Sequence, residues 1–167
     1  MKLENIDKVT FKKRLNRFQA GLVIALLVLG LGLSQVFIAL WSDGGSNTLL
    51  NLAAVACAAL IIAAVVNALK DQPWLHEIMY VRSLKQELNR IYRASRKLEE
   101  ALKQDNHAAV IVRYFQLHAS KHLYELEDNT LTMEEQVGMI AVLDEQIARL
   151  GMTVSIEDYR PQLLDQL

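Results

Sequence analysis

Two apolar stretches dominate the pattern of hydrophobic and polar positions along the chain. Residues 18–41 and 48–69 contain no charged residue, and a short run of polar residues and glycines separates them. As helices they would extend roughly 36 Å and 33 Å, against a bilayer hydrocarbon core of about 30 Å. A core helix of a small soluble domain normally keeps a polar stripe, which both stretches lack. The pattern therefore predicts a transmembrane helical hairpin.

The charged residues around this hairpin predict its orientation. A cleavable signal peptide has an apolar region of about 7–15 residues, so the longer first stretch is expected to remain as an anchor. Lys and Arg in short loops stay in the cytoplasm, and the connecting loop carries only Asp43 as a charged residue. Both termini are therefore expected in the cytoplasm. The basic and aromatic residues expected at the membrane interface are Lys12, Lys13, Arg14, Arg17, Trp41 and Trp74.

Small residues recur along both apolar stretches, including Gly21, Ala25, Gly30 and Gly32 in the first and Ala54 and Ala58 in the second. In lipid, small residues let helix backbones approach closely. They predict a helix–helix contact, either between the two stretches of one chain or between copies of the chain.

Behind the hairpin, the apolar spacing becomes that of amphipathic helices. Pro73 is suited to the first turn of a helix, which we expect to run to about Gln104. This helix carries an apolar seam of a and d heptad positions, and half of the flanking e and g positions from Lys85 to Ala101 are apolar or semi-apolar. The widened face favours an intramolecular bundle over a two-stranded coiled coil. The seam consists of Trp74, Val81, Leu84, Leu88, Ile91, Leu98 and Leu102.

Two further helices are predicted after it. The first covers about residues 107–126, with Ala108, Val112, Phe115, Ala119, Leu123 and Leu126 on its buried face. The second begins with a Thr132–Glu135 capping box and stops at Gly151. Its expected buried residues are Met133, Val137, Ile140, Leu143, Ile147 and Leu150. A short helix capped by Ser155 is expected before Pro161.

The expected fold class is thus all-α, with a transmembrane helical hairpin followed by a cytoplasmic bundle of about three helices. We expect three parts: a basic cytoplasmic segment at 1–17, the hairpin at 18–69 and the helical domain at 70–167.

Charge is distributed unevenly although the formal net charge is only −1. Residues 82–103 carry seven cations and three anions, whereas residues 104–167 carry four cations and eleven anions. The basic stretch is either a solvated surface or a face that binds a partner or lipid headgroups. Aromatic residues do not interleave with it as base stacking requires, so nucleic acid is not an expected partner. The interaction residues on this face are Arg82, Arg90, Arg93, Arg96 and Lys97.

Catalytic motifs are weak. His118 and His122 lie four residues apart on one helix, a spacing that can share a zinc ion, but the sequence lacks the glutamate of the His-Glu-x-x-His signature. No glycine-rich phosphate loop is present, and the single cysteine, Cys57, lies inside the second apolar stretch. The sequence predicts no enzyme activity, catalytic residue or cofactor, with His118 and His122 as weak metal candidates.

Several short segments resemble a family of small proteobacterial two-span membrane proteins known only as a domain of unknown function. The likeness extends over nearly the whole chain, and it implies a bacterial inner membrane without indicating an activity. The segments are Leu69-Lys70-Asp71, Pro73-Trp74, Tyr80-Val81, Leu84 to Asn89 and Tyr124 to Thr130.

Three functional hypotheses follow. The first is a non-enzymatic interaction, scaffold or accessory protein of the inner membrane, whose partners are the lipid bilayer and either another protein or copies of itself. The second is a homo-oligomeric channel lined by Gln35, Asn51 or Asn67. The third is a zinc-binding protein that uses His118 and His122. No small-molecule substrate is indicated.

Overall fold

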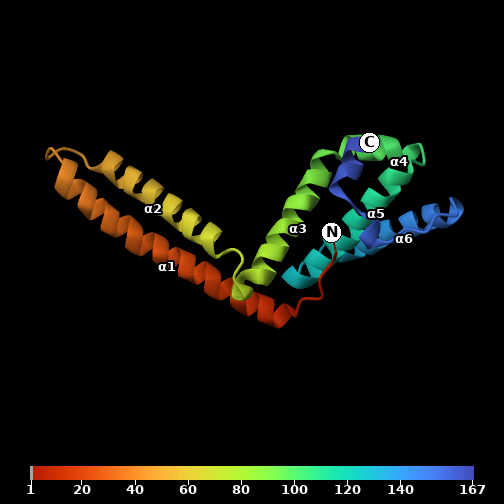
Figure 1. Ribbon diagram of the computed structural model, residues 1–167, viewed down its shortest axis with the longest axis horizontal. Coiled ribbons are helices and arrows are strands. Elements are labelled where there is room, and N and C mark those ends of the chain that lie inside the picture. Colours follow the sequence, from red (N-terminus) through yellow and green to blue (C-terminus); the bar gives the residue numbers. More distant parts are fainter. Residues whose placement is uncertain (1) are drawn as a thin grey trace. The chain divides into compact units, whose positions relative to one another are not determined.

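The computed structural model describes residues 2–167, which form helices joined by short turns and contain no strand (Figure 1). The all-α class predicted from the sequence is confirmed, with two long apolar helices followed by several further helices. The elements are α1 Lys8–Trp41, α2 Thr48–Leu69, the 3-10 helix η1 Pro73–Leu75, α3 His76–Arg93, α4 Ser95–Lys103, α5 His107–Glu127, α6 Met133–Arg149, and the 3-10 helices η2 Ile156–Asp158 and η3 Pro161–Gln166.

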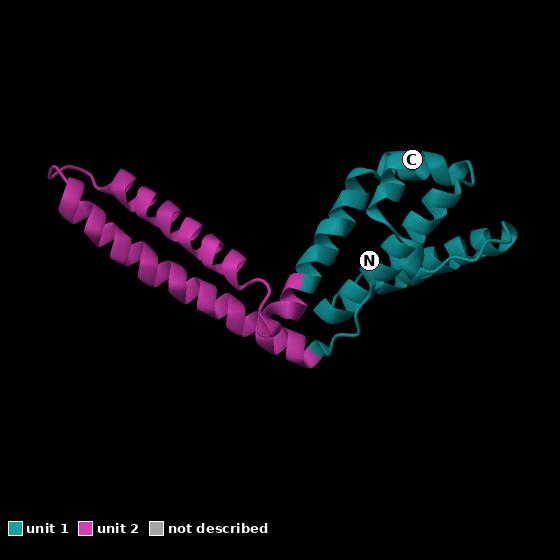
Figure 2. Cartoon of the chain, in the orientation of Figure 1, with its two compact units in different colours: residues 1–8, 80–167 teal, residues 9–79 magenta. Residues whose placement is uncertain are grey.

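The chain forms two compact units (Figure 2). Residues 9–79 form the hairpin unit, which holds most of α1 and all of α2. Residues 80–167, together with the N-terminal segment up to Lys8, form the helical unit. The N-terminal segment therefore belongs structurally with a part of the chain that follows it by more than 70 residues in sequence.

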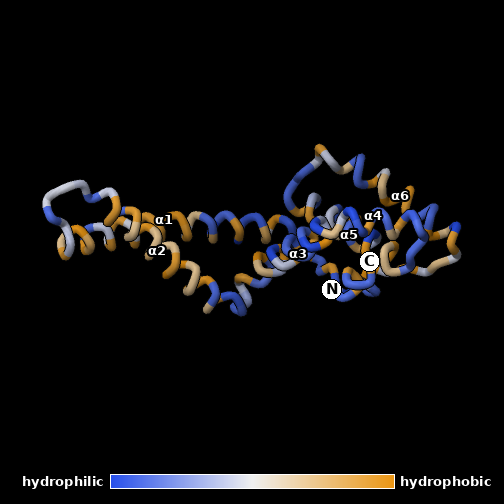
Figure 3. The backbone as a smooth tube through the Cα atoms, turned by 90° about the horizontal axis from the view of Figure 1, so that it is seen from above, coloured by the Kyte–Doolittle hydropathy of each residue, from blue (hydrophilic) through white to orange (hydrophobic). Residues whose placement is uncertain are grey.

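In the hairpin unit, α1 is longer than the predicted span of residues 18–41. The helix begins at Lys8, and residues 8–17 contain neither proline nor glycine, so nothing interrupts it before the apolar stretch. Only 6% of the most apolar window of α1 and 11% of that of α2 are buried. By length and composition both helices could cross a membrane, and Figure 3 shows the hydrophobic residues along them.

Small residues form the contact between the two helices of the hairpin. Gly30, Ala54 and Ala58 are buried, and a Cβ atom added at Gly30 would lie 3.7 Å from Val55 Cγ2. The buried Ser34 hydroxyl donates a hydrogen bond of 2.5 Å to Asn51 Oδ1 across the helix pair. At these positions the small-residue contact joins the two stretches of one chain.

The uninterrupted helix predicted for residues 73–104 is wrong. Pro73 begins a single 3-10 turn, and the helix that follows is broken at Ala94, whose amide donates to the Ile91 carbonyl at 3.0 Å instead of continuing the α-helical pattern. The apolar seam is nevertheless buried at Leu84 and Ile91 in α3 and at Leu98 in α4. The seam is buried by packing within the chain and does not form a long straight coiled coil, because the break at Ala94 lets α3 and α4 run in different directions.

Helix α5 is the centre of the helical unit, in contact with α4, α6, η2 and η3. Asn106 caps its start, since its side-chain oxygen accepts a hydrogen bond of 3.2 Å from the Ala109 amide. All six residues predicted for its buried face are buried, and so are Ala109, Val110, Ile111 and Leu117. The helix is therefore covered on more sides than an amphipathic surface helix.

Helix α6 differs from the prediction at its first turn. Thr132 makes no capping hydrogen bond and its buried hydroxyl has no partner in the described residues, so the predicted capping box is wrong. Gln136, at 5% exposure, takes the inner position and donates to the Leu117 carbonyl at 2.8 Å, which leaves Val137 exposed. Gly151 stops α6 with a φ of +62°, as predicted. Ser155 also forms its cap, for the short helix η2.

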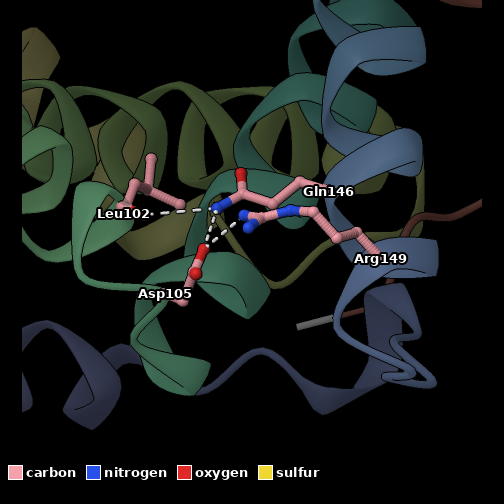
Figure 4. A network of polar contacts seen from close by, with 4 residues as sticks. All are labelled: Leu102, Asp105, Gln146 and Arg149. Atoms are coloured by element: carbon pink, nitrogen blue, oxygen red, sulfur yellow. Dashed lines mark hydrogen bonds and ion pairs between the residues drawn. The ribbon is translucent and has the colours of Figure 1, made fainter.

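A polar network fixes α6 to the turn before α5 (Figure 4). Asp105 adopts a left-handed backbone, with a φ of 52°, that directs the chain from α4 into α5. Its carboxylate accepts hydrogen bonds from Gln146 at 2.9 Å and from Arg149 at 2.8 Å, and Gln146 also donates to the Leu102 carbonyl at 3.2 Å. Side chains near the end of α6 thereby stabilise the α4–α5 turn.

Polar contacts at Lys2, Glu4 and Lys8 hold the N-terminal segment to residues 80–167. Lys2 pairs with Glu157 at 2.9 Å, the Glu4 amide donates to the Tyr80 hydroxyl at 2.9 Å, and Lys8 pairs with Asp128. The ion pairs are largely exposed and contribute little individually. Their spread along the segment nevertheless defines its path from η2 to the end of α5.

The C-terminal segment is anchored by Tyr159, which is fully buried. Its ring stacks on Phe115 with centroids 4.0 Å apart and planes 8° apart, and its hydroxyl donates to Glu87 Oε1 at 2.5 Å. Burial raises the pKa of Tyr159, and the bond to Glu87 raises it further. The protonated hydroxyl is thus the form that the fold requires.

We expect Tyr159→Phe to lower the free energy of unfolding by about 1–2 kcal/mol, because it removes a hydrogen bond to a charged group and leaves Glu87 without that donor. Thermal unfolding of the full chain in detergent, followed by circular dichroism, measures the change. Tyr92→Phe, at a residue with 71% exposure, is the matched control. Equal midpoints for the two variants would show that the Tyr159 bond is not stabilising.

Candidate interaction surface

A surface groove runs along α5 and α6 in the helical unit. It consists of two hollows, of about 410 Å³ and about 420 Å³, that share Arg113, Leu117 and Met139. The first hollow extends towards α3 at Lys85 and Tyr92. Together they form the α5–α6 groove, which has the size of a small-molecule pocket but follows the length of a helix.

Exposed apolar residues gather along this groove. Met139 and Val142 of α6 line it, and Val142 is 68% exposed. Val137 on the same helix and Leu131 just before it are also exposed, but they line neither hollow. Single exposed apolar residues are normal, whereas several that gather beside a hollow are typical of a docking surface.

This surface was missed from the sequence although a signal for it exists. Helix α6 carries apolar residues on two faces, and the inner face packs Ile140, Leu143 and Ile147 against the core of the unit. Met139 and Val142 then remain on the outer side. An apolar stripe wider than one neighbour can cover is the pattern that indicates a second contact.

Charged groups of both signs border the groove. Arg113 donates to Gln116 Oε1 at 3.0 Å, Lys85 pairs with Glu127, and Glu135 lies on the α6 side. Such a polar rim around an apolar centre is common in protein–protein interfaces.

The basic face predicted from the sequence lies elsewhere on the helical unit. The break at Ala94 divides it between α3 and α4, and none of its five residues lines the two hollows. Arg96 pairs with Glu100 at 3.3 Å, and the charge of Arg90 lowers the pKa of Tyr159, against the effect of burial. All five cations, Arg82, Arg90, Arg93, Arg96 and Lys97, are exposed.

The residues predicted for the membrane interface belong to the hairpin unit. Trp41 is exposed and contacts Phe37 edge to face at 5.3 Å, near the loop end. At the other end, Trp74 is half-exposed and lies 6.4 Å from the Phe18 ring. Of the four basic residues, Lys13 and Arg17 are exposed, whereas Lys12 and Arg14 are half-buried.

The two candidate zinc ligands lie on successive turns of α5. Their Nε2 atoms are buried and have no hydrogen-bond partner among the described residues. The His118 ring packs on Tyr114 at 4.3 Å, and the His122 ring lies edge-on to Tyr80 at 6.4 Å. Within residues 2–167 no group of three or more His, Cys, Asp or Glu residues is arranged to hold a metal ion. The pair by itself supplies two of the three protein ligands of a catalytic zinc site.

Burial lowers the pKa of His118. The Asp144 carboxylate on α6 opposes this effect and the nearby Lys121 ammonium adds to it. Because the Nε2 atom of His118 is buried and has no hydrogen-bond partner among the described residues, the neutral form of the imidazole is the one that the fold accommodates.

Because folding lowers the pKa of His118, we expect acid to destabilise the helical unit. A group whose pKa is lowered on folding contributes stability above its unfolded pKa of about 6.5, and that stability is lost as the pH falls. The unfolding midpoint of the full chain should therefore drop between pH 7.5 and pH 5.5, and His118→Gln should reduce the drop. His107→Gln, at the start of the same helix, should leave it unchanged, and equal effects of both variants would contradict the assignment.

Comparison with known proteins identifies the family of the chain. The family described as "Protein of unknown function (DUF3087)" matches residues 1–164, which include both apolar helices and nearly all of the helical unit. A search of curated proteins found no match, and a search of solved structures found none. The resemblance to a domain of unknown function is confirmed, and the chain belongs to this DUF3087 family.

Proposed function

We propose that this chain is an integral protein of the bacterial inner membrane that acts without catalysis, as an accessory or scaffold subunit. In this proposal the hairpin unit anchors the protein and the helical unit binds a protein partner in the cytoplasm through the α5–α6 groove. The observation that carries the partner role is the group of exposed apolar residues at that groove.

The exposed apolar surface of the hairpin unit supports the membrane anchor. Residues such as Ile24, Leu31 and Leu60 are more than half exposed along α1 and α2. Leaving such side chains in water is unfavourable, and a bilayer covers them at the length that these helices have. The bordering cations favour the orientation with both termini in the cytoplasm.

The N-terminal segment supports the same orientation. Its contacts with Glu157, Tyr80 and Asp128 place it together with residues 80–167 in one compact unit. A segment before the first span and a unit after the second can make these contacts only when both lie on the same side of the membrane. An even number of spans meets that condition.

The groove supports a protein partner more than a small ligand. Its apolar residues lie along one face of α6 over more than one helical turn, as in a surface that receives a helix or an extended segment. The rim offers both Arg113 and Glu135 for polar contacts. The separate basic face on α3 and α4 would attract acidic partners or anionic headgroups.

A homo-oligomeric channel is the second candidate. Asn51 accepts a hydrogen bond from Ser34 within the hairpin. The side chains of Gln35 and Asn67, in contrast, are exposed and form no hydrogen bond to another residue within 2–167. A polar amide in lipid is stabilised by a hydrogen bond to another helix. These two residues therefore favour association of the hairpin with further helices, from copies of the chain or from a partner.

To test the partner role, we expect Val142→Glu to release the partner from the complex that is extracted gently from the source membrane. The charge would face an apolar contact and weaken it at least tenfold, equivalent to about 1.4 kcal/mol. Size-exclusion chromatography with mass spectrometry measures the loss. Ala141→Glu adds the same charge beside the groove at an exposed position that does not line it. A complex that survives Val142→Glu would contradict the assignment of the groove.

The channel alternative predicts single-channel steps from the purified chain in planar bilayers. If Gln35 and Asn67 line the pore, Gln35→Leu together with Asn67→Leu should abolish these steps while insertion is retained. Steps that persist in this variant would exclude the two amides as the lining. A silent wild-type protein would leave the accessory role as the better account.

A further inference from the structure

The hairpin unit contains a groove of its own, separate from the α5–α6 groove. It has a volume of about 510 Å³ and lies between the first half of α1 and the last part of α2. Ligand pockets in proteins typically have volumes of about 300–1,000 Å³. Its walls are aliphatic, with Leu22, Ala25, Leu29, Ile62, Val65 and Val66 among the lining residues.

The groove arises from the way in which the two helices are held. Gly30 and the Ser34–Asn51 hydrogen bond join α1 and α2 in the half of the hairpin nearer the connecting loop. Figure 3 shows α2 diverging from α1 towards its C-terminal end. Gly21 lines the resulting space, and a Cβ atom added there would meet nothing within 4 Å. The helices therefore leave an apolar groove open along the surface of the hairpin.

One end of the groove is basic and aromatic. Arg14, Arg17 and Trp74 line it, and Trp74 contacts Phe18. The Nη1 atom of Arg14 donates to both carboxylate oxygens of Glu77, at 2.8 and 2.6 Å, so Nε and Nη2 are not used in this ion pair. Arg17 is exposed and forms no hydrogen bond or ion pair within residues 2–167. A cation without a counter-charge thus lies beside an apolar groove.

We propose that this groove binds one anionic glycerophospholipid, with an acyl chain between α1 and α2 and the phosphate on Arg17 and Arg14. The proposal rests on the membrane placement given under the proposed function. The aliphatic walls match a hydrocarbon chain, and guanidinium groups bind phosphate through charge-assisted hydrogen bonds. The tryptophan ring lies where an interfacial aromatic would contact the glycerol region. A zwitterionic lipid would fill the same walls, but its headgroup cation would offset the phosphate charge that faces Arg17.

The two tryptophans allow a direct test. In Trp41→Phe, Trp74 is the sole tryptophan of the chain and reports on the groove. The full chain is reconstituted in phosphatidylcholine vesicles that contain a rising fraction of either phosphatidylglycerol or phosphatidylcholine with brominated acyl chains, which quench tryptophan. We expect half-maximal quenching of Trp74 at a several-fold lower fraction of brominated phosphatidylglycerol than of brominated phosphatidylcholine.

Variants separate a built site from general attraction to charged lipid. Arg17→Gln should remove the preference for phosphatidylglycerol, whereas Lys13→Gln, an exposed cation in the same stretch that does not line the groove, should keep it. Gly21→Leu should reduce quenching by both lipids, because the new side chain occupies the space of the acyl chain. Trp74→Phe reports Trp41, at the other end of the hairpin, and should show no preference.

Each outcome decides the proposal. Equal effects of Arg17→Gln and Lys13→Gln would overturn it in favour of a diffuse electrostatic attraction. Equal quenching by the two lipids would overturn it as well. An absence of Trp74 quenching would also overturn it and would indicate a second copy of the chain in the groove. Flotation of the vesicles after an alkaline carbonate wash tests the anchor separately. A chain that does not float refutes the membrane placement, whereas one that floats without lipid preference refutes the lipid site alone.

Discussion

The constraint on which the rest of the structure depends is apolar surface that the chain does not bury by itself. Helices α1 and α2 contact each other through a narrow line of small residues, which leaves most of their side chains exposed. Gly30 and Ala58 have no large side chain that would keep the two helices apart. The Ser34–Asn51 hydrogen bond gives two polar groups at the contact a partner. Such a hairpin is stable where its surroundings are apolar, as the proposed anchor requires.

The helical unit, in contrast, buries most of the apolar surface of its central helix within the chain. Helix α5 is nearly surrounded by α4, α6 and the two C-terminal 3-10 helices, so its apolar residues are removed from water inside the chain. Few polar contacts are needed to set the geometry: Gln136 to the Leu117 carbonyl, Tyr159 to Glu87, and Asp105 to the end of α6. Each joins segments that the apolar packing has already brought together.

The two grooves differ in the partner that their chemistry suits. The α5–α6 groove has apolar residues and a rim of both charges, which matches a protein segment. The groove of the hairpin unit is aliphatic and ends in cations, which matches an anionic lipid. A protein that is held in the membrane by one unit and binds a partner through the other would combine both functions without a catalytic group.

The sequence by itself determined the helical class, the apolarity of the two long helices, the bounds of α2, the buried face of α5 and the stop at Gly151, because these follow from local periodicity and backbone preference. Only the tertiary structure decided the break at Ala94, the exchange of Gln136 for Val137 on the inner face of α6, and the attachment of the N-terminal segment to residues 80–167. The two grooves also belong to this second group. They depend on which residues remain uncovered after neighbouring helices have packed, and contacts between distant residues leave no periodic signal in the sequence.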